Sequence, residues 1–207
     1  MTLIGYGGND RSSVPEIFNQ ASGCFMGRES WDNITNMDWI EDGPVPADIA
    51  SNANRAVVMG VPLIPHDSGT SWNTLLDQAA AGTHNSKYYS LGQKMAQLGA
   101  RTVYARVWWE FNMGDEYPNT TKFKAAWQVA IPQIRNGFNA AKTSEQQLKI
   151  VLCSMPDRDH STQRDAYYPG SGYVDVVSYD VYGKTYASSN QSKATVLAEV
   201  QGYWADL

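Results

Sequence analysis

Thr102-Val-Tyr-Ala-Arg-Val-Trp-Trp-Glu110 is an apolar, β-branched and aromatic run that ends in a carboxylate. This composition predicts a buried β-strand over Thr102–Trp109, with two faces that differ because side chains alternate across a strand. One face has Val103, Ala105, Val107 and Trp109, and the other has Tyr104, Arg106, Trp108 and Glu110. An arginine and a carboxylate on one face fit either a functional site at an exposed strand end or a buried ion pair that holds the sheet together.

Short apolar runs alternate with longer helical stretches on both sides of this strand, which predicts βαβ units and a parallel sheet. Strands are expected at 3–7, 24–27, 62–65, 102–109, 149–154 and 174–181, and helices from about 13 and at 46–59, 86–98, 121–141 and 193–207. Polar and aromatic clusters follow most of these strands, as at the carboxyl end of a barrel. An open doubly wound sheet is the alternative, but the first strand lacks a glycine-rich phosphate loop. We therefore expect one α/β domain over 1–207, a TIM-type (β/α) barrel with about six βα units.

Charge and cysteine content exclude several partners. The chain has a net charge of −5 and no run of Lys or Arg, so it lacks the basic surface that grips nucleic acid. No stretch approaches the roughly 18 apolar residues of a membrane helix, and the first residues have no signal-peptide pattern. Cys24 and Cys153 show no metal or disulfide spacing, so buried free thiols are expected. Since no histidine has zinc-ligand spacing either, we expect no metal and no cofactor.

Aromatic residues are abundant, with Trp 7 and Tyr 12, and several lie beside polar residues. Sugar rings stack on such side chains because their C–H faces are apolar while their edges carry hydroxyls, although any single ring can equally be a core residue. His66 and Trp72 bound the polar segment after the expected third strand. Trp72 and Trp108 are candidates for sugar binding, and His66 would either bind a sugar hydroxyl or cap the loop. For His84 and His160, solvated loops are expected.

Carboxylates at two strand ends suit glycoside cleavage, in which one acid protonates the leaving oxygen and a second carboxylate attacks or activates water. Glu110 suits the acid role, because Trp108 on the same face would desolvate it and raise its pKa. The sixth strand brings Asp180 and Tyr182 to the same end. Asp180 would either support the site or bind loop amides as a structural carboxylate.

Four segments resemble glycoside hydrolase family 26, the β-mannanase-like group of retaining barrel glycosidases. They are Ala81-Gly-Thr-His-Asn-Ser-Lys-Tyr88, Arg106-Val-Trp-Trp-Glu-Phe-Asn-Met-Gly114, Tyr167-Tyr-Pro-Gly170 and Tyr173-Val-Asp-Val-Val-Ser-Tyr-Asp-Val-Tyr182. The second is similar to the family's Arg-x-x-His-Glu-x-Asn-Gly signature. The resemblance implies that Glu110 is the general acid/base, that Arg106 and Asn112 support it, and that Tyr182 lies near the nucleophile. It also implies a secreted or extracellular hydrolase that degrades a β-linked polysaccharide.

The sequence departs from the family at two points. Trp109 stands where mannanases usually have histidine, which leaves the polysaccharide open. The family's nucleophile is a glutamate on a seventh strand, and the expected elements end with the sixth strand and a helix, in which Glu199 is a poor substitute. Three interpretations remain. The chain is a fragment of a longer barrel, or another segment or copy covers its exposed sheet edges, or it is a non-catalytic carbohydrate-binding or structural protein with a degenerate barrel.

Overall fold

The computed structural model describes residues 5–6, 24–27, 56–64, 70–108, 111, 118–154 and 165–179. In this part of the chain the strands are β1 Gly5–Tyr6, β2 Cys24–Gly27, β3 Ala56–Val61, β4 Thr102–Val107, β5 Gln147–Ser154 and β6 Val176–Tyr179. The helices are α4 Trp72–Ala80, α5 Asn85–Gln97 and α6 Thr120–Ala141. None of these helices is both long and apolar enough to cross a bilayer.

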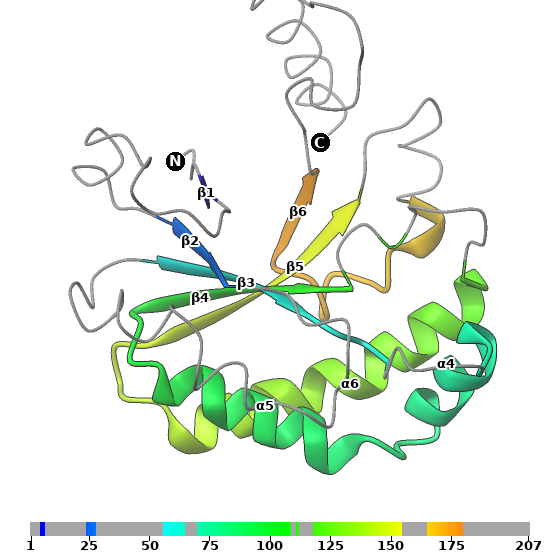
Figure 1. Cartoon of the computed structure of the whole chain (residues 1–207), viewed down its shortest axis with the longest axis horizontal. Helices are drawn as coiled ribbons and strands as arrows, with labels where there is room; N and C mark the ends of the chain where they lie inside the picture. The colour runs from blue at the N-terminus through cyan, green and yellow to red at the C-terminus, as the bar shows by residue number, and fades with distance from the viewer. Residues whose placement is uncertain are drawn as a thin grey trace, which may run out of the picture.

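The order of the strands decides between the two expected architectures. All six strands are parallel and each lies beside its neighbour in the chain, in the order β1-β2-β3-β4-β5-β6. A doubly wound sheet reverses its strand order at a switch point, and its helices cover both faces. Here α4, α5 and α6 lie together on one side of the sheet (Figure 1). The predicted TIM-type (β/α) barrel architecture is confirmed by this arrangement.

The main core fills the space between the sheet and these three helices. Alternate strand residues such as Val57, Val103 and Ile150 have no exposed area and pack against helix residues such as Leu91 and Ile134. The opposite face of the sheet carries a smaller buried cluster around Val151 and Cys153. In a barrel this second face lines the interior, and the site lies at the carboxyl-terminal ends of the strands.

β3 lies elsewhere than the sequence predicted. A helix was expected over 46–59 and a strand over 62–65, whereas Ala56–Val61 is the strand. Its residues are buried or half-buried on both faces, so the run lacks the alternation that distinguishes a strand from a helix. Gly60 therefore lies within the strand. Pro62, which has no N–H for the ladder, follows the last strand residue.

α4 was not predicted from the sequence. Ser71 caps it, because its Oγ accepts a hydrogen bond from the Thr74 N–H at 3.3 Å, and its buried stripe is Leu75, Leu76 and Ala79. α5 and α6 lie within one residue of the expected 86–98 and 121–141, and the strands other than β3 lie where expected. The helices expected from about 13 and over 193–207 lie outside the described residues.

The described end of the β5–β6 connection is held along α6 by side chains of that helix. After a short helical turn at 165–167, the chain passes Pro169, Gly170 and Gly172, which disfavour helix. Trp127 Nε1 donates to the Tyr173 carbonyl at 3.2 Å, and Gln128 and Arg135 donate to the carbonyls of Pro169 and Gly172 at 2.9 and 2.6 Å. These bonds satisfy backbone acceptors that a helix would have satisfied internally.

The carboxylate of Asp175 joins this connection to β5. We expect an asparagine at this position to form weaker hydrogen bonds than the aspartate. Asp175 Oδ2 accepts from the Ile150 N–H at 2.7 Å and from Arg135 Nη2 at 3.0 Å. Asp175→Asn is expected to lower the free energy of unfolding by about 1 kcal/mol, because two charge-assisted bonds become neutral or are lost. Urea unfolding measures the change. Asp77→Asn is the control: its pair with Lys122 is 57% and 37% exposed, and such pairs contribute about 0–0.5 kcal/mol. Equal losses in both variants would contradict the prediction.

Candidate functional site

The two faces of β4 differ as its sequence predicts. Val103, Ala105 and Val107 have no exposed area and lie in the core shared with the helices. Tyr104 packs on the opposite face against the cluster around Val151 and Cys153. The predicted separation into an apolar helix-packing face and a polar interior face is confirmed for the described residues of this strand.

Arg106 is 4% exposed on the interior face, near the carboxyl end of β4. Its neighbours in the sheet register are Gly60 on β3 and Val151 on β5, and Gly60 has no side chain to compete for the interior space. One guanidinium nitrogen, Nη2, donates to Cys153 Sγ at 3.4 Å. Cys153 is a buried free thiol, as predicted. The strand therefore places a buried cation at the carboxyl end of the sheet, where barrels carry their sites.

Trp108 does not share the face of Arg106, so this placement from the sequence is wrong. Its backbone is left-handed, with φ 41°, and its side chain is 4% exposed in the main core. Its N–H still donates to the Val61 carbonyl at 2.7 Å, and its ring lies against Trp72 and Phe123, with centroids 5.4 and 5.7 Å away. Since alternation stops at Trp108, the expected desolvation of Glu110 by this ring loses its basis. A role of Trp108 in sugar binding remains a prediction.

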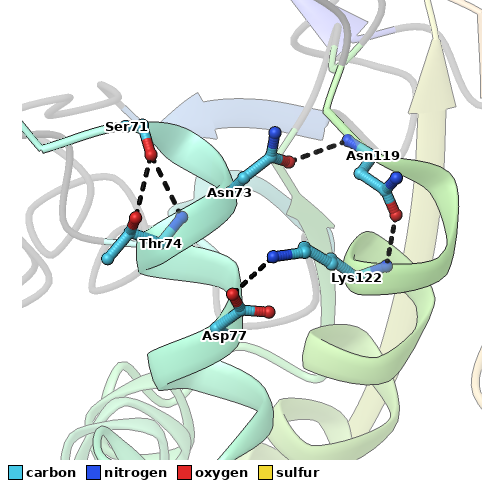
Figure 2. Close-up of polar contacts among 6 residues, drawn as sticks. All are labelled: Ser71, Asn73, Thr74, Asp77, Asn119 and Lys122. Atoms are coloured by element: carbon cyan, nitrogen blue, oxygen red, sulfur yellow. Dashed lines mark hydrogen bonds and ion pairs between the residues drawn. The ribbon is translucent and has the colours of Figure 1, made fainter.

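The structure brings together Trp72 and Trp108, two of the residues predicted to bind sugar. Trp72 begins α4, is half-buried, and meets Trp108 edge to face at 80°. The start of α6 lies beside it: the Asn119 N–H donates to Asn73 Oδ1 at 3.2 Å, and Lys122 pairs with Asp77 (Figure 2). Both helices therefore begin side by side next to the end of β4.

An aromatic cluster that the sequence reasoning missed extends from this point. We define the aromatic cluster as Trp72, Trp108, Phe111, Phe123, Trp127 and Tyr167. Neighbouring ring centroids lie between 4.8 and 5.7 Å apart. The spacing of Phe123 and Trp127 on one helix face was a usable sequence signal. Phe111 joins the cluster from the turn after β4 and Tyr167 from the helical turn at 165–167, and no local sequence pattern predicts such contacts.

The segment around His84 and Tyr88 is more buried than expected. Tyr88 has no exposed area and donates its hydroxyl to the Leu63 carbonyl at 2.5 Å, which fixes the chain just after β3. Burial raises the pKa of Tyr88 well above its usual value, so the phenol remains a donor. His84 is half-buried and its ring edge meets Tyr88; burial lowers the pKa of His84, and the Lys87 ammonium adds to this effect. His84 thus lies in a turn, as expected, but its side chain is less solvated than expected.

The other predicted site residues lie outside the described residues: His66, Glu110, Asn112, Asp180 and Tyr182. An ion pair between Arg106 and Glu110 accordingly stays a prediction. Among the described residues, no group of three His, Cys, Asp or Glu side chains is arranged to hold a metal ion.

Comparison with known proteins agrees with the expected resemblance. The model of Glycosyl hydrolase family 26 matches residues 105–203, so the family resemblance is confirmed. No curated protein matches the chain by sequence. GH26C from Muricauda sp. MAR_2010_75 is similar in structure, with a TM-score of 0.61 and 13% identity, over 89% of this chain and 55% of that chain.

Two solved mannanases are also similar in fold. A GH26 β-mannanase from Bacteroides ovatus, BoMan26A, gives a TM-score of 0.55 at 14% identity, over 89% of this chain and 57% of its own. Mannanase man26 of Bacillus subtilis gives 0.52 at 16% identity, with 85% and 58% covered. The chain thus spans a little more than half the length of these proteins. At such identities the likeness establishes the barrel fold.

Proposed function

We propose, from the premise that the chain is a divergent glycosyl hydrolase family 26-like protein, that it is a retaining glycosidase of β-linked polysaccharides. Glu110 is assigned the general acid/base role, and the nucleophile is not identifiable in this chain. The observation that carries the proposal is the family match, which begins at residue 105 and contains the whole segment from Arg106 to Gly114.

The position of Arg106 supports this assignment. Its buried guanidinium lies on the interior face, one residue before β4 ends, and Glu110 follows within four residues. By the resemblance, Arg106 is a residue that supports the acid/base group, and its place near this strand end suits that role. The carboxyl end of the strands is also where barrel enzymes hold their catalytic residues.

We assign sugar binding to seven residues that the sequence leads us to expect at this end of the sheet: His66, Trp72, Arg106, Trp108, Asn112, Asp180 and Tyr182. Trp72 has the most support, because its half-buried ring keeps some surface exposed while its contact with Trp108 holds it in place. Such a held ring suits stacking on the apolar face of a sugar. By the same resemblance we propose that the protein acts outside the cell.

Reducing-sugar release from mannan, glucan and xylan tests the enzyme assignment. Glu110→Gln is expected to lower kcat/KM by about 100-fold or more, the usual contribution of a general acid/base group. Glu145→Gln is the matched control, because Glu145 is exposed in the turn before β5, at the opposite end of the sheet. Equal activity of the two variants would remove Glu110 from the mechanism.

The alternative is a non-catalytic carbohydrate-binding or structural protein with a degenerate barrel, because binding requires no second carboxylate. The partly exposed ring of Trp72 is compatible with this alternative as well. Calorimetric titration with the same polysaccharides distinguishes the two. Binding without product release, weakened in Trp72→Ala, supports the alternative.

A further inference from the structure

The chain on both sides of residues 109–110 is anchored in the aromatic cluster. Trp108 is 4% exposed and packs on Phe123 of α6. Phe111, which is bonded directly to Glu110, is 1% exposed and packs on the same Phe123, with centroids 5.0 Å apart. In the chain, Glu110 therefore lies between two residues whose rings are buried against the same Phe123.

Tyr167, in the connection between β5 and β6, contacts this part of the chain at two points. Its ring lies 4.8 Å from Phe111 and meets Phe123 edge to face at 5.2 Å. Its hydroxyl donates to the carbonyl of Pro118, two residues before α6 begins. Tyr167 is 5% exposed, and this bond is buried. Tyr167 thus contacts the chain that follows β4 at two points, Phe111 and Pro118.

We propose that Tyr167 is a positioning residue for Glu110, acting through its ring on Phe111 and through its hydroxyl on Pro118. This inference rests on the proposed function of Glu110. The acid must deliver its proton to the glycosidic oxygen as the bond to the anomeric carbon breaks, so its distance from that oxygen sets the rate. A displacement of about 1 Å can lower such a rate roughly 100-fold.

The hydroxyl and the ring have separable contributions. Loss of the hydroxyl removes the hydrogen bond to the Pro118 carbonyl, while the ring contacts to Phe111 and Phe123 stay. Tyr167→Phe therefore removes this hydrogen bond with little change in core volume. Phe111→Leu tests the other contact, because it removes the ring that Tyr167 packs against.

The test compares two substrates of the same sugar: the polysaccharide that releases most product, and its 2,4-dinitrophenyl β-glycoside. Dinitrophenolate leaves without a proton, so kcat/KM for this glycoside does not depend on the acid, whereas cleavage of the polysaccharide does. Tyr167→Phe is expected to lower kcat/KM for the polysaccharide by about 10-fold to 100-fold and to leave that for the glycoside within about twofold. Phe111→Leu is expected to show the same selectivity.

Tyr168→Phe is the matched control, because Tyr168 is the adjacent tyrosine and is 37% exposed. It is expected to match the unmodified protein on both substrates. A general structural defect in Tyr167→Phe would lower both activities equally and would overturn the positioning role. Selective loss in Glu110→Gln without selective loss in Tyr167→Phe would overturn this inference alone. If Glu110→Gln loses nothing, the proposed function fails, and the role of Tyr167 fails with it.

Discussion

Gly137→Ala is expected to lower the free energy of unfolding by about 3 kcal/mol, near the upper end of what overpacking usually does. A Cβ at this position would lie 1.9 Å from the Tyr89 carbonyl oxygen and 2.7 Å from its carbon. These are backbone atoms of α5, so no side-chain rotation relieves the clash, and the two helices must separate. The gain in helix propensity from glycine to alanine, about 1 kcal/mol, is too small to compensate.

The same contact is seen from the other helix. A Cβ on Gly92 of α5 would lie 2.0 Å from the Ile134 carbonyl oxygen and 2.6 Å from the Phe138 nitrogen. α5 and α6 therefore approach backbone to backbone at two glycines that face each other's helix, side by side under the sheet (Figure 1). Gly92→Ala is expected to be as damaging as Gly137→Ala.

Thermal and urea unfolding measure the loss at Gly137. For a chain of this length about 3 kcal/mol corresponds to a fall in Tm of roughly 6–12 °C. Gly172→Ala is the control, because a Cβ there meets no atom within 4 Å in the described structure. An unchanged Tm in Gly137→Ala would mean that the helices do not pack this closely.

Phe123→Ala is expected to lower the free energy of unfolding by about 3–5 kcal/mol and also to reduce activity. Phe123 has no exposed area and is the ring on which Trp108, Phe111 and Tyr167 meet. Its truncation removes buried area and leaves a cavity at the centre of the aromatic cluster. The segment that carries Glu110 then loses its packing partner on α6.

Phe138→Ala separates the two effects. Phe138 is 1% exposed near the other end of α6, so its truncation is expected to be similarly destabilising. Activity is compared at a temperature where both variants are folded, as judged by circular dichroism. Phe123→Ala is expected to lose activity while Phe138→Ala keeps it. Equal losses would show that the aromatic cluster contributes stability alone.

Much of the architecture was predictable because it depends on local periodicity. The order of apolar runs predicted a parallel sheet, and α5 and α6 lie within a residue of their expected bounds. The prediction for β3 was wrong for a physical reason. Ala56–Val61 is covered on both faces, so its sequence lacks the alternation of a half-exposed strand and fits a helix equally well. α4 was passed over although Ser71 and the stripe of Leu75, Leu76 and Ala79 carry a capping and helical signal.

The candidate site was predictable to a smaller extent. The sequence identified Arg106 as a charged residue on the interior face, and the structure buries it there. Trp72 was also singled out, but its contact with Trp108 was not foreseen. The family resemblance came from the segment around Glu110, and the match over 105–203 agrees with it.

By itself the sequence determined the alternation of β4, because each residue in a strand points opposite to the one before it. That was enough to separate Val103, Ala105 and Val107 from Arg106. Only the tertiary structure decided where the alternation stops. The left-handed backbone of Trp108 turns its ring into the core, where contacts with Trp72 and Phe123 hold it. Contacts between residues far apart in the chain have no signature in local spacing, since they exist only once the sheet and helices have packed.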